Sequence, residues 1–121
     1  MVSILLVDDD PGQLELFRLL LRHLPYTLIN AQSGDEALQA LEQQVPDAIV
    51  LDLAMPRING FAVLDHIKDN PRYKSTKVII LTAVPERMSR ETAESVDKVI
   101  SKAFLVPRLE QTLEELLAAP H

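Results

Sequence analysis

Five short apolar segments alternate with amphipathic helical patterns along the sequence, and this alternation constrains the fold more than any other feature. The segments expected to form strands are Ile4 to Val7, Tyr26 to Ala31, Ala48 to Leu51, Lys77 to Leu81 and Lys98 to Ser101. The third and fourth contain "AIVL" and "VIIL", which are apolar on both faces, as in a parallel sheet covered on each side. The alternation therefore predicts an α/β domain with a parallel sheet and helices on both faces.

Capping signals mark where the expected helices begin. Pro11 suits the first position of a helix with Asp10 as its N-cap, and "SGDE" from Ser33 is a capping box that opens the second helix. A third helix follows Gly60 and ends at "DNP", a short fourth is expected around Met88 to Ser95, and a fifth begins near Pro107. The side chains predicted to face inward are Leu14, Phe17, Leu21, Leu24, Leu38, Leu41, Val45, Phe61, Leu64, Ile67, Leu109, Leu113, Leu116 and Leu117, with His66 at the surface.

Composition excludes several classes of protein. A chain of 121 residues has the length of one domain, and a net charge of −6 with no Lys/Arg run disfavours direct nucleic-acid binding. The chain has no cysteine, which rules out disulfides and thiol catalysis and fits a reducing compartment. No stretch approaches the roughly 20 apolar residues of a membrane span, and the first apolar run is too short for a signal peptide. We therefore expect a cytoplasmic protein.

Charged and polar residues follow four of the expected strands. Asp8, Asp9 and Asp10 come directly after the first strand, Asp52 after the third, Thr82 after the fourth and Lys102 after the fifth. Ligands of open parallel sheets bind at the carboxyl ends of the strands. Acids after a strand often only cap the next helix, which is the role expected of Asp10. The combination nevertheless predicts a site at this edge of the sheet.

A cluster of Asp8, Asp9 and Asp52 needs a compensating charge. Two unit charges about 4 Å apart repel by roughly 4 kcal/mol at an effective dielectric constant near 20. A divalent cation bound by carboxylates, a backbone carbonyl and water would relieve this repulsion, and such all-oxygen ligation suits Mg²⁺ or Mn²⁺. The three histidines show no ligand spacing. We therefore expect a Mg²⁺ site, with Mn²⁺ as an alternative ion.

Four segments together resemble the signatures of a known family. "ILLVDDDP", "PDAIVLDLAMPRINGF", "VIILTA" and "SKAF" are similar, in order and across the whole chain, to the signature segments of receiver domains of two-component response regulators. The resemblance implies that residues 1–121 form one receiver domain. It also implies a flavodoxin-like, three-layer αβα fold, with five parallel strands in the order 2-1-3-4-5 and five helices.

The resemblance also implies a role for each site residue. Asp52 would accept a phosphoryl group from a phosphohistidine on a sensor histidine kinase or a phosphotransfer protein. Asp9 and Asp52 would ligate Mg²⁺ directly, Asp8 would act through water, and Ala54 would contribute its backbone carbonyl. Thr82 and Lys102 would each bind a phosphoryl oxygen, because catalysis of phosphoryl transfer is mainly positioning and charge neutralisation.

Such a domain phosphorylates itself and is not an enzyme that turns over. Ala54 and Val84 would lie beside the water that attacks the phosphorylated aspartate, and neither side chain can hydrogen-bond to it, so slow autodephosphorylation is expected. The chain ends after the fifth helix with "AAPH". This ending fits either a stand-alone regulator with an output partner or a receiver whose effector domain lies outside the sequence. Neither membrane nor nucleic acid is an expected partner of the domain itself.

Three positions depart from the family pattern. Ala103 follows Lys102 where the family usually has proline, Val99 stands where an aromatic residue is usual, and Asn59 stands where aspartate is usual. A non-proline cis peptide bond costs about 2.5 to 4 kcal/mol, so the bond after Lys102 should be trans. Without an aromatic ring at Val99, we expect phosphorylation to couple weakly to the fourth helix, fifth strand and fifth helix.

Two other functions compete with this interpretation. Asp8 and Asp10 after a strand also resemble haloacid-dehalogenase-like phosphatases, with Asp8 as nucleophile, but that family needs a longer chain and a later acidic pair. The second alternative is a degenerate receiver that binds partners without being phosphorylated. Val99 and Ala103 favour this alternative, whereas the intact acids, Thr82 and Lys102 oppose it.

Overall fold

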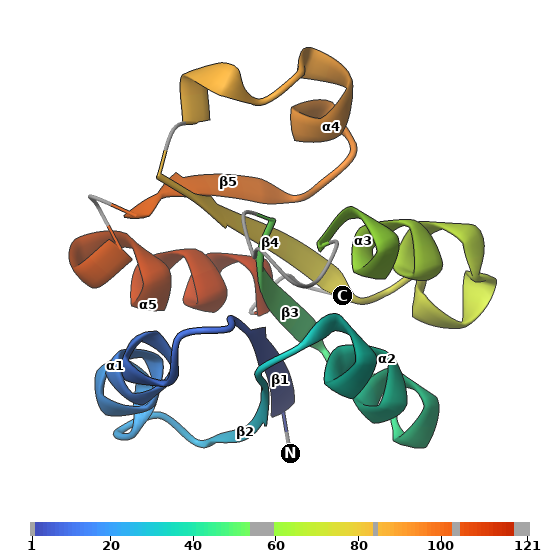
Figure 1. Cartoon of the computed structure of the whole chain (residues 1–121). Helices are drawn as coiled ribbons and strands as arrows, with labels where there is room; N and C mark the ends of the chain where they lie inside the picture. Colours follow the sequence, from blue (N-terminus) through green and yellow to red (C-terminus); the bar gives the residue numbers. More distant parts are fainter. Residues whose placement is uncertain (1, 54–59, 84, 103–104, 118–121) are drawn as a thin grey trace.

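A five-stranded parallel sheet forms the centre of the molecule in the computed structural model, which describes residues 2–53, 60–83, 85–102 and 105–117 (Figure 1). The strand order is β2-β1-β3-β4-β5, as the family resemblance predicted. In chain order the elements are β1 (Val2–Val7), α1 (Pro11–Leu21), β2 (Tyr26–Ala31), α2 (Gly34–Gln43), β3 (Ala48–Asp52), α3 (Gly60–Asp69), the 3-10 helix η1 (Pro71–Tyr73), β4 (Lys77–Thr82), the 3-10 helix η2 (Pro85–Arg87), α4 (Arg90–Glu94), β5 (Lys98–Ser101) and α5 (Leu105–Leu117).

Two apolar cores lie on opposite faces of the sheet. Helices α1 and α5 cover one face and α2 and α3 the other, as Figure 1 shows. Alternate residues of each strand enter alternate cores, so that Leu5 and Val7 pack toward α2 and α3 while Ile4 and Leu6 pack toward α1 and α5. Every residue of the central strand β3 is buried. The prediction of a three-layer αβα fold with apolar central strands is confirmed.

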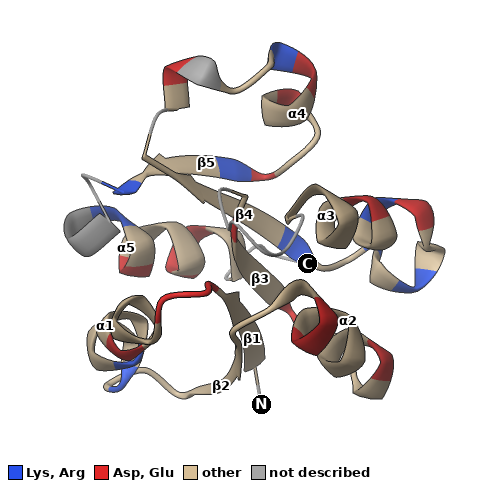
Figure 2. Ribbon diagram, viewed as in Figure 1, with Lys and Arg blue, Asp and Glu red and all other residues tan. Residues whose placement is uncertain are grey.

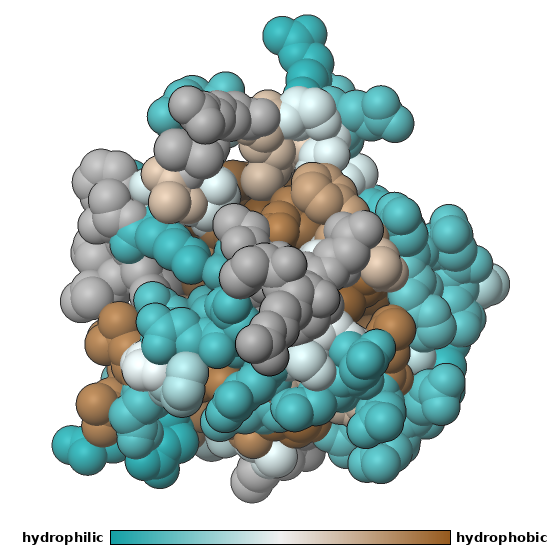
Figure 3. All heavy atoms as spheres, in the orientation of Figure 1, coloured by the Kyte–Doolittle hydropathy of each residue, from teal (hydrophilic) through white to brown (hydrophobic). Residues whose placement is uncertain are grey.

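Helix α1 begins as the sequence predicts. The Asp10 side chain accepts a hydrogen bond from the Gly12 N–H at 2.9 Å, which caps the helix. Leu14, Phe17 and Leu21 are buried on its inner face. Leu24 lies beyond the end of the helix and packs only partly against the same core. Leu19 is 49% exposed, and Figure 3 shows apolar side chains over α1 at the lower left, with a second apolar area below α4.

Helix α2 is capped as predicted but buries a different face. The Ser33 Oγ accepts from the Glu36 N–H at 2.9 Å, and the Glu36 carboxylate accepts from the backbone N–H of Gln32. The buried side chains are Ala37 and Leu41, whereas Val45 is 40% exposed and Leu38 is partly buried. The prediction for Val45 is wrong because the helix ends at Gln43, so Val45 no longer follows the helical ridge.

Helix α3 differs from its prediction at two positions. Val63, Leu64 and Ile67 form the buried face, and Phe61 is 47% exposed, because the stripe that faces the sheet is centred closer to Val63 than to Phe61. His66 is partly buried instead of lying at the surface, with its ring centroid 5.5 Å from that of Tyr73. Tyr73 is held there because its hydroxyl donates to the Leu41 carbonyl at 2.9 Å and so ties η1 to the end of α2.

Helix α4 is shorter than predicted, and α5 starts earlier than predicted. Helix α4 has only five residues, none of them buried, because its segment lacks an apolar stripe. The ammonium group of Lys68 donates to the carbonyl of Ser95, just beyond α4. Helix α5 begins at Leu105, before Pro107, and buries Leu109 and Leu113, while Leu116 and Leu117 are partly buried. In the described ranges, no helix has the length and apolar character needed to cross a bilayer.

Candidate functional site

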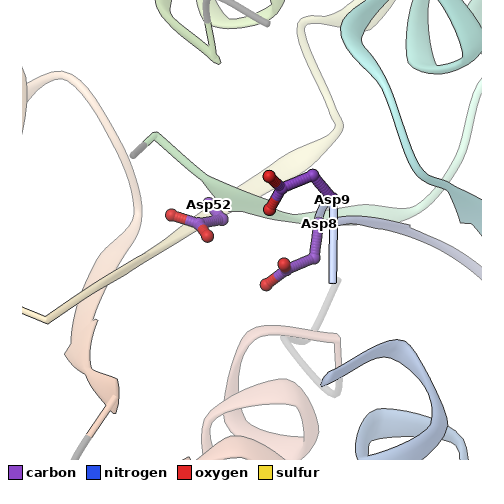
Figure 4. A group of neighbouring side chains, drawn as sticks. All are labelled: Asp8, Asp9 and Asp52. Carbon is purple, nitrogen blue, oxygen red and sulfur yellow. The ribbon is translucent and has the colours of Figure 1, made fainter. Parts of the chain in front are cut away.

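Three carboxylates meet at the carboxyl ends of neighbouring strands. Asp8 and Asp9 directly follow β1, and Asp52 is the last residue of β3, the next strand in the sheet. One carboxylate oxygen from each of the three lies within 4.8 Å of the others (Figure 4). Asp8 and Asp52 are only 1% and 3% exposed. The sheet thus holds three carboxylates close together, of which Asp8 and Asp52 are buried and Asp9 is partly exposed.

One ammonium group compensates part of this charge. The Lys102 Nζ donates to the Asp52 Oδ2 at 2.8 Å and lies 3.8 Å from the Asp8 Oδ2. Burial lowers the pKa of Lys102, but the hydrogen bond to Asp52 and the charges of Asp52, Asp8 and Asp9 outweigh it, so the pKa is raised above its usual value. Lys102 is therefore charged at neutral pH. Three carboxylates still face a single ammonium, which leaves the group negative.

Asp8 is the most constrained of the three acids. Its Oδ1 accepts a hydrogen bond from the Asp10 N–H at 3.0 Å, and its own N–H donates to the Ala31 carbonyl. Its Oδ2 is buried and finds no hydrogen-bond donor among the described residues. Burial, together with the charges of Asp52 and Asp9, raises the pKa of Asp8 to about 6, although the Asp10 N–H and Lys102 act in the opposite direction.

These residues fit a bound divalent cation. Carboxylate oxygens are the ligands that Mg²⁺ and Mn²⁺ prefer, and the site offers three of them with no sulfur or imidazole. The unpartnered Asp8 Oδ2 is a further acceptor that a hydrated cation could satisfy. The donor set and the excess negative charge both match such an ion.

Of the other predicted site residues, the structure describes Thr82 and Ala83 but not Ala54. Thr82 ends β4, pairs in register with Ser101 and is 8% exposed, while Ala83 beside it is exposed. Both lie at the carboxyl-terminal edge of the sheet, where Asp52 ends β3. Ala54, whose carbonyl is the predicted metal ligand, lies outside the described residues, as do Pro56, Asn59, Val84 and Ala103. Of the predicted site residues, the structure describes Asp8, Asp9, Asp52, Thr82 and Lys102, and it brings Asp8, Asp9, Asp52 and Lys102 into one group.

The predictions from sequence missed two polar groups at the start of α1. The Asp10 N–H that binds Asp8 is a backbone group, and only the turn from β1 into α1 brings it there. Gln13 in the first turn of α1 has a buried side-chain nitrogen. Its position one helical turn before Phe17 is the one signal in the sequence, because it places a polar residue on an otherwise apolar ridge.

Gly60 is required where α3 starts against the end of β3. A Cβ atom at this position would lie 2.8 Å from the Leu53 Cα and 2.9 Å from the Asp52 carbonyl oxygen. Both neighbours are backbone atoms, so a larger residue would displace the chain beside Asp52. Gly60→Ala should lower the free energy of unfolding by about 1 to 3 kcal/mol, the range for overpacked sites, as measured by chemical denaturation.

Gly12→Ala is the matched control for this substitution. Its Cβ would meet one side-chain oxygen, the Asp10 Oδ1 at 3.3 Å, and no backbone atom, and alanine is the better helix former. We expect its free energy of unfolding to change by less than about 1 kcal/mol. Equal losses in the two variants would contradict the account of Gly60.

Comparisons with known proteins agree with this geometry. Residues 4–114 match the response regulator receiver domain family. The polar-differentiation response regulator DivK of Brucella ovis is 31% identical over 117 residues, which cover 95% of each chain. The crystal structure of the response regulator TrrA of Thermotoga maritima in complex with Mg²⁺-BeF is 32% identical and superimposes with a TM-score of 0.85, covering 97% of this chain and 100% of that one.

A second structure of TrrA shows it with a partner. In its complex with the histidine kinase ThkA, TrrA is 32% identical to this chain, and the TM-score is 0.83, with 97% of this chain and 99% of that one covered. Both relatives match the present chain in length, and TrrA also matches it in fold.

Proposed function

The chain belongs to the response regulator receiver domain family, and from that membership we propose that Asp52 is the residue that accepts a phosphoryl group from a phosphohistidine. The observation that carries the proposal is the position of Asp52. It ends the buried central strand, it lies among two further acids, and the Lys102 Nζ contacts it at 2.8 Å. As a receiver the domain is a signalling module.

The proposed reaction is a phosphoryl transfer between two side chains. A carboxylate oxygen of Asp52 forms a bond to phosphorus while the bond from phosphorus to the histidine nitrogen breaks, and that nitrogen keeps the electron pair and takes a proton. Lys102 and Thr82 would then each bind one oxygen of the acyl phosphate. Lys102 needs little movement for this role, since its ammonium already lies against Asp52. Autodephosphorylation by water would be slow, because Ala54 and Val84 cannot position that water.

Mg²⁺ is the proposed cofactor, with Mn²⁺ as an alternative. Asp9, Asp52 and the Ala54 carbonyl would hold the ion directly and Asp8 through water. When bound, the cation supplies charge neutralisation for the transferring phosphoryl group. The complex of TrrA with Mg²⁺-BeF supports this assignment by similarity.

The proposed phosphodonor is a sensor histidine kinase or a phosphotransfer protein, which the complex of TrrA with ThkA supports. An output partner, or an effector domain outside this sequence, would receive the signal.

Nucleic acid and membrane are not proposed as partners of this domain, since acidic residues are prominent on the ribbon in Figure 2 and the net charge is −6. The proposed compartment is the cytoplasm, because a chain without cysteine fits a reducing environment.

Intact mass spectrometry tests the proposal directly. Incubation with a small phosphodonor and Mg²⁺ should add one phosphoryl group, and incubation with the phosphodonor and a chelator should add none. A folded protein that stays unlabelled with Mg²⁺ would favour the degenerate receiver, which binds partners without phosphorylation. Phosphatase turnover that is lost in Asp8→Asn but kept in Asp52→Asn would favour the haloacid-dehalogenase-like alternative.

Mg²⁺ should also stabilise the fold. Binding to the folded state alone, at about 100 times the dissociation constant, adds about 2.7 kcal/mol to the free energy of unfolding. Thermal unfolding followed with increasing Mg²⁺ should therefore show a rising midpoint. Asp9→Ala should lose most of this rise, and a response equal to that of the wild type would place the ion elsewhere.

Phosphorylation should change the structure mainly around Asp52 and Thr82, with little effect on β5 and α5. Val99 on β5 is half-buried against the core of α2 and α3, and it has no ring that could change position when Thr82 binds the phosphoryl group. A ligand shifts an equilibrium only through contacts that differ between its two states. In NMR spectra recorded with and without a phosphoryl mimic, we expect large shifts beside Asp52 and Thr82 and small ones in β5 and α5. Equally large shifts across Lys98–Ser101 would contradict this expectation.

A further inference from the structure

Two buried polar atoms near the start of α1 lack hydrogen-bond partners within the described part of the chain. One is the Asp8 Oδ2, an acceptor, and the other is the Gln13 Nε2, a donor. A third such atom, the His66 Nε2, belongs to α3 on the opposite face of the sheet. Buried polar atoms are nearly always hydrogen-bonded to protein or to ordered water, so each exception requires an explanation.

Asp8 points to the face of the sheet that α1 covers. Along β1, Ile4 and Leu6 pack into the core of α1 and α5, and Asp8 continues the same alternation. Figure 4 shows its carboxylate on the side of the strand ends where the pale blue α1 and the pale red α5 lie. Asp8 is only 1% exposed, so its Oδ2, which lies 3.8 Å from the Lys102 Nζ but accepts no hydrogen bond from a described residue, is enclosed between the sheet and these helices.

Gln13 reaches the same region from the helix. It lies one turn before Phe17, which is fully buried in that core, so both side chains belong to one inward ridge. Helical side chains lean toward the N-terminus of their helix. The N-terminus of α1 follows Asp10, the residue whose N–H binds Asp8. The Gln13 amide therefore extends beyond Phe17 toward the end of β1, and beside carboxylates its donor end is the one that favourably faces inward.

We infer that Gln13 and Asp8 share a buried water molecule, which makes Gln13 a positioning residue for the acidic site. The water accepts a hydrogen bond from the Gln13 Nε2 and donates one to the Asp8 Oδ2. A single water satisfies both unpartnered atoms, and buried waters typically make about three such bonds. Asp8 is thereby held at both oxygens, by the Asp10 N–H at one and by the water at the other.

This inference rests on the proposed function, in which Asp8 orients the hydration shell of the bound cation. Partners that orient metal-binding side chains typically change metal affinity by 10- to 100-fold when they are removed. Gln13→Met keeps the length of the side chain and removes the donor. We expect it to raise the dissociation constant for Mg²⁺ about 10-fold, as measured by calorimetry on the whole chain. The matched control is Gln39→Met, at an exposed position of α2, which should leave the constant unchanged.

A double-mutant cycle tests whether Gln13 acts on Mg²⁺ affinity through Asp8. If Gln13 acts through Asp8, then Gln13→Met should change Mg²⁺ affinity by less than about twofold in an Asp8→Asn background, because the interaction has already been altered. Equal effects in the two backgrounds, or no effect in the wild type, would overturn the inference. Gln13→Leu is the second variant, should methionine disturb the packing beside Phe17.

A high-resolution crystal structure gives an independent readout. Density for a water within hydrogen-bond distance of both the Gln13 Nε2 and the Asp8 Oδ2 is the expected result, and a Gln13 amide turned to solvent would overturn the inference.

Phosphodonor labelling distinguishes failure of the shared water from failure of the proposed function. A labelled wild type with unchanged Mg²⁺ affinity in Gln13→Met overturns only the shared water. An unlabelled wild type, with weakened affinity in that variant, overturns only the proposed function.

Discussion

Asp52→Asn should abolish the uptake of a phosphoryl group from a small phosphodonor, while the protein stays folded. The substitution removes the carboxylate that would attack phosphorus and keeps nearly the same shape at the end of the buried strand β3. It removes one of three clustered negative charges, and Lys102, which loses its partner, still has the Asp8 carboxylate 3.8 Å away. Intact mass measured over time should show full labelling of the wild type and none of the variant.

Asp65→Asn is the matched control for this experiment. Asp65 is an exposed residue of α3 and lies outside the acidic group, so its variant should be labelled at the wild-type rate. Labelling of Asp52→Asn at that rate would show that another residue accepts the phosphoryl group. Peptide mapping of the labelled variant would then distinguish Asp8 from Asp9.

Without a metal ion, the contribution of Asp8 to stability should fall as the pH rises. The folded state holds the pKa of Asp8 at about 6, against a usual value of 3.8, so the folded protein binds this proton more tightly than the unfolded chain does. The stabilisation is fully present below about pH 3.8 and is lost as the pH rises through about 6. At about 1.4 kcal/mol for each pKa unit, the loss is on the order of 3 kcal/mol.

The difference between wild type and Asp8→Asn isolates this effect from other titrating groups. Asparagine is neutral throughout, so in a chelator the variant should gain stability over the wild type between pH 4 and pH 7, by up to about 3 kcal/mol. Denaturant unfolding at several pH values measures the difference. Saturating Mg²⁺ should reduce or reverse it, because the ion stabilises the ionised form of Asp8. A difference that stays constant from pH 4 to pH 7 would show that Asp8 is not destabilised by burial.

The sequence predicted the strands better than the faces of the helices. Apolar runs such as "VIIL" can be satisfied only where both sides are covered, so the central strands and the fold class follow from local pattern. A helix with several apolar residues allows more than one inward stripe. In α3 the stripe of Phe61, Leu64 and Ile67 competes with that of Val63, Leu64 and Ile67, and packing against the sheet decides in favour of the second.

The site was predictable in its composition but not in its contacts. Parallel strands place their carboxyl ends at one edge, so Asp8, Asp9, Asp52, Thr82 and Lys102 could be grouped from the sequence alone. The 2.8 Å contact of Lys102 with Asp52 depends on the path of a long side chain, and no periodicity reports that path. The same holds for the Asp10 N–H on Asp8, since backbone donors have no residue type to recognise.

Helix α4 has a consequence for how this domain can diverge. Because none of its five residues is buried, substitutions there remove no core contacts and leave no cavity. The five residues of α4 can therefore accumulate changes that would destabilise α2 or α3, whereas Met88 before the helix and Val96 after it pack against the core. Selection for a new binding partner could act on this part of the surface without reducing the margin of stability that keeps the rest of the chain folded.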